Sequence, residues 1–449
     1  MCSPRFIWLD CLKMAKRFSL KTMFSPLLIS VLTFVVYYTY VVNMPSSQEP
    51  GDTDHHHLGL HHISEESITP VSGTRHFMVG AYMEDRIMGH SLRIISIFRQ
   101  DSVQPLYCVF YCGTHWANGT EAVVHLHPEF FAQGFPFVAT DVLCQSPPGC
   151  YGSHVTISTQ ADFKLSVNHT FLRIQNLDEE TKIQFNFTVC VSNIFGDYNN
   201  VLQVTQTLEM YRLLGVQHVV LYNTSCGPDL ETLLQSYKQE GFVEVLPWPI
   251  DQYMKPSPGW LFGEHGGDIH YYGQLATLND CLYRQMYRSR YVLLNDLDEI
   301  ITPYQHETLP QLMEELQREH PKAGVFLVEN HIIHKNQFDP SGRFEHLWSY
   351  IPGRNIMEHI YRQEPIYPYS EMKMIVQPRK VIKTSVHSVI HSLEETVYIP
   401  SYLCRMLHIR APSPDISWEK LYEDKRIWDY ERQLITNVDK ALERAGLLI

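Results

Sequence analysis

Tyr291-Val-Leu-Leu-Asn-Asp-Leu-Asp-Glu299 decides the fold, because an apolar strand here runs directly into three acids. Carboxylates at the end of a buried strand are costly unless a cation or a hydrogen-bond donor pairs with them. Asp296 and Asp298, two residues apart on an extended segment, point to the same side. Such oxygen ligands suit Mg²⁺ or Mn²⁺, hard ions that also bridge to phosphate oxygens. The competing interpretation is a solvated acidic turn, since Asp-x-Asp alone is common.

Strands alternate with helices on the N-terminal side of this motif. Alternation of this kind predicts an α/β fold with a mainly parallel sheet, helices on both faces and a ligand site beyond the carboxyl ends of the strands. We expect the domain to cover residues 186–449. The predicted strands are 187–192, 218–222, 242–246 and 291–294, and the predicted helices are 201–214, 229–240 and 274–288.

Residues 74–185 follow a different pattern, with short alternating apolar runs such as 92–98 and 106–111 separated by turn residues. This pattern predicts a β-rich accessory domain. The preceding residues 43–73 are polar and predict a stem. Five histidines between positions 55 and 62 favour a solvated tract with adventitious metal affinity over a dedicated metal site.

The N-terminus predicts a membrane anchor. Residues 24–42 are uncharged and long enough to cross a bilayer, and basic residues lie in the preceding tail, 1–23. Positive flanks stay cytoplasmic, so the bulk of the chain should face the lumen of the secretory pathway. A cleaved signal peptide is the alternative, but the apolar run is long and no small-x-small site closely follows it.

Sequons and cysteines agree with a lumenal location. The eight cysteines after the anchor form an even set, as expected in an oxidising compartment. The close pairs 108/112 and 144/150 should bridge locally, with a connectivity that sequence leaves open; a zinc site is the alternative. The formal charge of −13 argues against a nucleic-acid partner. The four sequons begin at Asn118, Asn168, Asn186 and Asn223.

Residues 187–410 resemble glycosyltransferase family 92, a family with the GT-A fold. Positions 300 and 409 depart from the family pattern, with Ile where an aromatic residue and Tyr are frequent, and the usual Trp before Tyr211 is missing. These departures leave the acceptor open. The segments that carry the resemblance are, in order, 190–196, 209–222, 243–248, 272–274, 279–281, 296–299, 373–378, His387 and 408–410.

The resemblance implies a type II Golgi membrane enzyme that uses Mn²⁺ or Mg²⁺. It implies inverting transfer of galactose, in β-1,4 linkage, from UDP-galactose to a glycan acceptor such as fucose on an N-glycan core. A membrane-anchored lectin or an inactive transferase-fold protein is the non-enzyme alternative. A lumenal sulfotransferase is a second enzyme class, but it needs a lysine-bearing phosphate loop after the first strand, and residues 191–197 contain no lysine.

Several residues are candidates for the metal and the donor. Asp298 is expected to bind the metal, and Asp296 the metal or the ribose. A late histidine, His408 or alternatively His387, would be the third ligand, although a lone histidine is more often structural. Basic residues in the same late segments can pair with the diphosphate, or can simply form an exposed charged face. These are Lys373, Arg379, Lys380 and Arg410.

Inverting transfer also needs a general base near the acceptor hydroxyl. Glu329 is favoured because it ends a predicted strand, with Asp339, Glu358 and Glu371 as alternatives. Glu299 is expected either to orient the acceptor sugar or to accept a hydrogen bond behind the metal ligands. Aromatic residues around the loop 247–267 can stack on uracil or a sugar ring, or can belong to the core. They are Trp248, Trp260, Tyr271 and Tyr272.

Overall fold

The computed structural model describes residues 62–89, 91–113, 115–127, 133–150, 152–163, 169–177, 183–365, 371–411 and 420–448. The predicted tail and anchor, residues 1–42, lie outside this part of the chain, as does the stem up to residue 61. Within the described ranges, no helix is long and apolar enough to cross a membrane.

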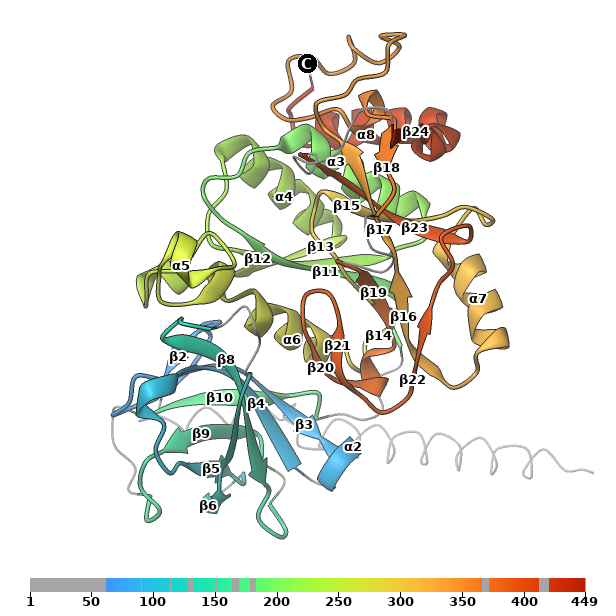
Figure 1. The fold of residues 1–449 in the computed structure, drawn as a ribbon. Helices are drawn as coiled ribbons and strands as arrows, with labels where there is room; N and C mark the ends of the chain where they lie inside the picture. The colour runs from blue at the N-terminus through green and yellow to red at the C-terminus, as the bar shows by residue number, and fades with distance from the viewer. Residues whose placement is uncertain are drawn as a thin grey trace, which may run out of the picture. The chain divides into compact units, whose positions relative to one another are not determined.

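A seven-stranded mixed sheet forms the centre of the C-terminal part (Figure 1). Four neighbouring strands, β13, β12, β11 and β14, run parallel, as the strand-helix alternation predicts. β19 then pairs antiparallel with both β14 and β16. In sheet order the strands are β13 (Val243–Pro247), β12 (His218–Asn223), β11 (Phe185–Ile194), β14 (Ser289–Leu294), β19 (Lys373–Val376), β16 (Ala323–Val328) and β22 (Glu395–Tyr398).

Side-chain alternation along β11 divides the core into two layers. Phe187, Val189 and Val191 pack with α3 (Val201–Leu213), α4 (Pro228–Glu240), α7 (Leu309–Glu319) and α8 (Glu431–Arg444). Cys190 points to the other face, which α6 (Gln274–Arg284) covers. Figure 1 shows α3 and α4 on one side of the sheet and α6 on the other. The helix predicted over 274–288 ends four residues earlier, where Gln285 leaves helical geometry.

A second sheet of five strands lies next to the acidic motif in sequence and carries the late histidine. Its order is β15 (Glu299–Pro303), β23 (Cys404–Arg410), β17 (Asn330–His334), β18 (Tyr361–Gln363) and β24 (Leu421–Glu423). A separate hairpin joins β20 (Val381–Thr384) and β21 (Val389–Ser392). Because β15 pairs antiparallel with β23, His408 stands opposite Glu299.

The N-terminal part is a ten-stranded β structure, in agreement with the predicted accessory domain. Ile68 and Val71 are buried beside its strands, so residues 62–73, placed in the stem from sequence, belong to the folded part. Two short helical segments accompany the strands, α2 (Asp85–Met88) and a turn at 100–102. The strands are β1 (His62–Ile63), β2 (Thr69–Pro70), β3 (Phe77–Glu84), β4 (Ser91–Arg99), β5 (Tyr107–Tyr111), β6 (Trp116–Glu121), β7 (Val123–Leu126), β8 (Phe137–Gln145), β9 (His154–Ser158) and β10 (Thr170–Gln175).

Three disulfides form within the described residues. Cys108–Cys144 and Cys112–Cys150 link the two close cysteine pairs crosswise, in agreement with local bridging in this region, and Cys190–Cys281 ties β11 to α6. Cys226 and Cys404 form no disulfide with a described residue. The even set of eight cysteines therefore contains six that are bridged here.

A buried polar cluster joins the β-rich part to the central sheet. Asp280, on α6, accepts hydrogen bonds from the Tyr82 hydroxyl at 2.6 Å and the Tyr222 hydroxyl at 2.5 Å. Arg284 lies 3.1 Å from the same carboxylate, which satisfies its charge. Burial, and then the carboxylate of Asp280, hold the pKa of Tyr222 well above its usual value, so both phenols stay protonated donors.

We predict that Gly80→Ala destabilises the protein. A Cβ at this position of β3 would lie 2.4 Å from Asp280 Oδ1, a distance that forces the cluster to shift. Overpacking of this kind lowers the free energy of unfolding by about 1–3 kcal/mol. Gly263→Ala is the control, because a Cβ there meets no atom within 4 Å. Equal melting temperatures for the two variants would contradict the prediction.

Candidate active site

The acidic motif forms a tight turn that its own third acid closes. β14 ends at Leu294, and the Asn295 amide still donates to the Cys190 carbonyl at 3.3 Å. The Asp296 amide then donates to Glu299 Oε2 at 2.9 Å, while the Glu299 amide donates to the Asp296 carbonyl at 3.2 Å. Glu299 is buried in this turn, whereas the side chains of Asp296 and Asp298 are about one third exposed, at 35% and 37%.

Two polar side chains of α3 form hydrogen bonds with the backbone of the turn. The Thr207 hydroxyl donates to the Leu297 carbonyl at 2.9 Å, and the Tyr211 hydroxyl donates to the Glu299 carbonyl at 2.6 Å. Both side chains are buried, so these bonds fix the backbone of the turn in a place that water does not reach. The polar residues of this buried helix therefore position the acids.

Lys373 is the cation that neutralises the inner side of the motif. Its ammonium nitrogen lies 3.0 Å from Asp296 Oδ2 and 3.0 Å from Glu299 Oε2, and its side chain is 3% exposed. Burial disfavours the charged form, but Asp296 and Glu299 outweigh it and raise the pKa of Lys373. Burial likewise raises the pKa of Asp296, but the charge and hydrogen bond of Lys373 prevail, so the pKa is lowered and this carboxylate stays ionised.

His408 lies on the outer side of the same acids. Its Nε2 is 3.4 Å from Asp298 Oδ2 and its Nδ1 is 3.6 Å from Glu299 Oε1. The Ile409 amide donates to the Asp298 carbonyl at 2.9 Å, which keeps β23 against the turn. Burial lowers the pKa of His408, but the hydrogen bond to Asp298 and the charge of Glu299 outweigh it, so its pKa is raised overall.

The donor atoms at this point suit a divalent cation. Two ligands that each lie about 2.1 Å from one ion are separated by about 3–3.4 Å. The 3.4 Å between Asp298 Oδ2 and His408 Nε2 is within this range. Among the described residues, however, no group of three or more His, Cys, Asp and Glu side chains is already gathered as a metal site. Asp296, which Lys373 holds, would be the further oxygen ligand.

His387 is the other late histidine that the sequence singles out. Its Nδ1 lies 3.2 Å from the Met372 carbonyl oxygen, which only accepts hydrogen bonds, so Nδ1 carries the hydrogen and Nε2 the lone pair. Burial, and then the nearby charge of Lys373, lower the pKa of His387 to about 4. The ring is therefore neutral at pH 7, the form in which histidine binds metal.

Aromatic rings gather on the side of the acids that faces His387. Trp260 stacks on Tyr271 with ring centroids 4.6 Å apart, and Phe195 stacks on Tyr272 at 3.9 Å. Both tyrosines have positive φ angles, 39° and 51°, which bulky residues rarely adopt and which concentrate at functional sites. Burial, and then the charges of Asp296 and Asp298, raise the pKa of Tyr271, so its hydroxyl stays protonated near the acids.

Trp248 has a supporting role in this arrangement. Its side chain is fully buried, and its indole Nε1 donates to the Tyr272 carbonyl at 2.8 Å. Asn193 donates from Nδ2 to the Tyr271 carbonyl at 2.9 Å. These two bonds hold the backbone of the paired tyrosines in its unusual conformation, so of the four predicted aromatic residues, Trp248 belongs to the core.

The remaining predicted residues are spread over a wider area. Glu329 follows Val328, the residue opposite Lys373, and lies 3.1 Å from His331 Nε2. Arg410 is paired with Glu371 at 3.2 Å, and both side chains are largely exposed. Whereas Glu329 lies at the same edge as the acids, the Arg410–Glu371 pair lies further out on the surface.

Arg379 and Lys380 lie away from the acids because of the direction in which β19 runs. This strand runs antiparallel to β14, with Met374 opposite Leu294 and Val376 opposite Val292. The residues after Val376 therefore approach the start of β14, where the charge of Arg290 acts on Arg379, while Lys380 pairs with Glu394 at 2.8 Å. The structure does not bring either side chain to the acidic motif.

Sequence reasoning missed Ser192 and Gln274. The Ser192 hydroxyl donates to Asp296 Oδ1 at 3.2 Å, and Gln274 Nε2 donates to the Ser192 oxygen at 2.8 Å. Asp296 is thus held at one oxygen by a hydroxyl and at the other by Lys373. The sequence did contain a signal for Ser192. It is a polar residue near the carboxyl end of a predicted parallel strand, and such a residue lies at the same sheet edge as the acids that end the neighbouring strand.

We predict that Lys373→Met strongly destabilises the protein. It would leave Asp296 and Glu299 without their cation, and removing one partner of a buried ion pair costs about 3–5 kcal/mol in the free energy of unfolding. Lys380→Met is the control, because its pair with Glu394 is well exposed and should contribute less than about 1 kcal/mol. Urea unfolding measures both, and equal losses would rule out a structural role specific to Lys373.

Comparison with known proteins gives a consistent result. A family model described as Glycosyltransferase family 92 matches residues 185–440. A glycosyltransferase family 92 protein of Caenorhabditis elegans is 23% identical over 248 residues, covering 53% of this chain and 44% of that protein. The beta-1,4-galactosyltransferase galt-1 of the same organism is 25% identical over 121 residues, 26% of each chain. The chain thus spans less than half the length of these relatives.

One solved structure, described as S. aureus TarS 1-349, matches with 11% sequence identity and covers 58% of this chain and 70% of that one. Its TM-score is 0.21, which is too low to support an argument about the fold.

Proposed function

The chain belongs to glycosyltransferase family 92, and on this premise we propose that it is a metal-assisted, inverting hexosyltransferase with a GT-A-like catalytic domain. The proposed donor is UDP-galactose, the proposed linkage β-1,4, and the proposed acceptor a glycan such as fucose on an N-glycan core. The proposed location is the Golgi membrane, with a type II anchor over residues 24–42 and the catalytic part in the lumen.

The observation that supports this proposal most is the arrangement around Asp298. Its carboxylate lies 3.4 Å from His408 Nε2, at the carboxyl end of β14, with the aromatic rings of Tyr271 and Trp260 on the neighbouring side. Asp298 and His408, with Asp296 or His387, would hold Mn²⁺ or Mg²⁺. When bound, such an ion supplies positive charge beside the diphosphate leaving group.

Each of the surrounding side chains would then have its own role. Lys373 holds Asp296 in its ionised form, and the closed turn with Glu299 keeps Asp298 aimed outward. The faces of Trp260 and Tyr271 offer a stacking surface for the uracil base. Glu299 is too buried to reach an acceptor, which favours its hydrogen-bonding role behind the metal ligands. We therefore propose Glu299 as a positioning residue.

A glycan-binding protein without transferase activity is the second candidate, and Lys373 is the observation that favours it. Its ammonium ion already pairs with both Asp296 and Glu299, so each of these acids has a cationic partner without a metal. Binding of UDP separates the two functions, because a transferase needs the nucleotide and a lectin does not.

We predict that the full-length protein releases UDP from UDP-galactose when Mn²⁺ is present, and that a core-fucosylated N-glycan stimulates release. Chelation with EDTA should abolish the activity. Asp298→Ala should lower it by about 100-fold or more, because transition-state charge stabilisation by one such group has this magnitude. Asp101→Ala, an exposed acid in the β-rich part, is the control and should keep full activity.

Two results would count against the transferase. Release that continues in EDTA, or that is unchanged in Asp298→Ala, would exclude the proposed metal role. Glycan binding with no Mn²⁺-dependent UDP binding would instead support the lectin.

A further inference from the structure

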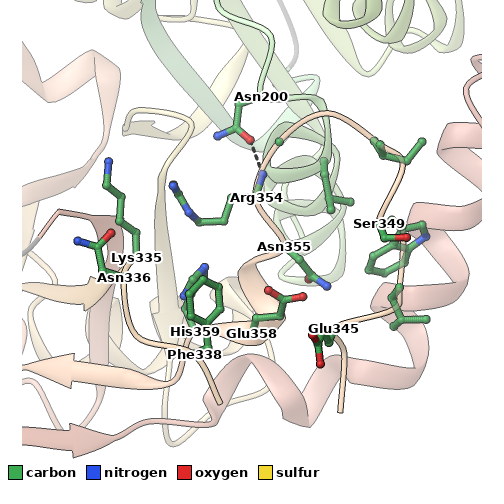
Figure 2. A pocket seen from close by; sticks show the side chains of 15 residues that line it. Asn200, Lys335, Asn336, Phe338, Glu345, Ser349, Arg354, Asn355, Glu358 and His359 are labelled. Carbon is green, nitrogen blue, oxygen red and sulfur yellow. Dashed lines mark hydrogen bonds between the residues drawn. The ribbon is translucent and has the colours of Figure 1, made fainter. Parts of the chain in front are cut away.

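A polar pocket in the C-terminal part is lined by none of the residues assigned above to the metal or the donor. Its volume is about 640 Å³, within the range of small-molecule sites. The lining comes from the start of α3, the segment after β17 and the segment 345–359. Figure 2 shows Arg354 and Glu358 near the middle of the pocket, with Lys335 on one side and Glu345 on the other.

Tyr198 feels the charges of both the acidic motif and the pocket. Burial, and then the charge of Asp298, raise the pKa of Tyr198 to about 12, whereas a hydrogen bond with Asn200 and the charge of Arg354 oppose the increase. Asn200 and Arg354 both line the pocket. The Lys335 amide also donates to the Arg410 carbonyl at 3.0 Å, next to the strand that carries His408. One wall of the pocket is therefore hydrogen-bonded to the end of β23, the strand that carries His408.

Phe338 and His359 form an aromatic platform inside the pocket. Their ring centroids are 4.9 Å apart, and Phe338 is 57% exposed, so the face of its ring is accessible to a ligand. His359 Nδ1 lies 2.9 Å from the Gln337 carbonyl oxygen, so Nδ1 carries the hydrogen. Its buried Nε2, an acceptor, has no hydrogen-bond partner in the part of the chain that the structure describes.

The charged residues of the pocket are also available for a ligand. Among the described residues, neither Arg354 nor Lys335 forms a salt bridge through its side chain, although both are only partly exposed. Glu345 and Glu358 lie near each other, and burial together with the charge of Glu345 raises the pKa of Glu358. Of the four predicted general bases, Glu358 is the one that lines this cavity, while Asp339 lines a smaller cavity of about 390 Å³ that adjoins it.

We propose that this pocket binds the oligosaccharide acceptor, an inference that rests on the function proposed above. A sugar ring has an apolar face that packs on an aromatic ring and a rim of hydroxyls that both donate and accept hydrogen bonds. Phe338 supplies the ring, Glu358 accepts from hydroxyls, and Arg354 and Lys335 donate to them. A site of positive charge alone would instead suit a phosphate, but this pocket contains both signs.

The test measures acceptor and donor separately in the full-length protein with Mn²⁺. Phe338→Ala should raise the KM for a core-fucosylated N-glycan at least about fivefold, through the lost ring contact. The KM for UDP-galactose and the slow release of UDP without glycan should stay unchanged. Tyr402→Ala removes an aromatic ring that is equally exposed but lies outside the pocket, and should behave as the wild type.

Two outcomes overturn the inference. The first is an unchanged KM for the glycan in Phe338→Ala. The second is a higher KM for UDP-galactose in Arg354→Gln with normal glycan kinetics, which would show that the pocket binds the donor. If the wild type releases no UDP, the transferase proposal fails, and glycan binding measured by ligand-observed NMR then decides on the pocket. Binding that is lost in Phe338→Ala supports the pocket, and binding that is absent or unchanged rejects it.

Discussion

The ion pairs of Lys373 with Asp296 and Glu299 are the interaction on which the site depends. Three acids within four residues at the end of a buried strand repel one another and lose hydration, so they persist only beside positive charge. Lys373 supplies one charge from the neighbouring strand, and Glu299 closes the turn by accepting from the Asp296 amide. Asp296 and Glu299 share this cation, whereas Asp298 faces outward beside His408.

The fold around this interaction is organised to hold one sheet edge rigid. α3 supports the turn through Thr207 and Tyr211, and Ser192 fixes the remaining oxygen of Asp296. The β-rich part contributes indirectly, because its Tyr82 shares the carboxylate of Asp280 with Tyr222, on the strand next to β11. The shared carboxylate of Asp280 therefore ties the accessory domain to the central sheet.

Much of this architecture could be predicted from sequence because its signals are local. Strand-helix alternation predicted the parallel strands β11 to β14, and the run from Tyr291 to Glu299 predicted acids at a strand end. Bridging among the four cysteines of the β-rich part was also expected, although their connectivity was left open. The end of α6 was placed four residues too late, since apolar periodicity continues to Met286 although the helix stops at Arg284.

What sequence could not provide depends on strand direction and register. The antiparallel course of β19 brings Lys373 to the acids but takes Arg379 to the opposite end of β14. Lys373 and Arg379 are only six positions apart in one basic segment, so the sequence alone could not predict which of them lies near the acids. The pocket around Phe338 and Arg354 was not predicted for a similar reason. Its residues come from the start of α3 and two later loops, which only the tertiary structure brings together.

The most direct test of the account measures Mn²⁺ binding to the full-length protein by electron paramagnetic resonance, with and without UDP. We predict that UDP increases the affinity for Mn²⁺, and that Asp298→Asn abolishes this UDP-dependent binding while the variant keeps its melting temperature. Identical Mn²⁺ binding in the wild type and Asp298→Asn, or no effect of UDP on the wild type, would contradict the claim that this strand end is a metal and nucleotide site.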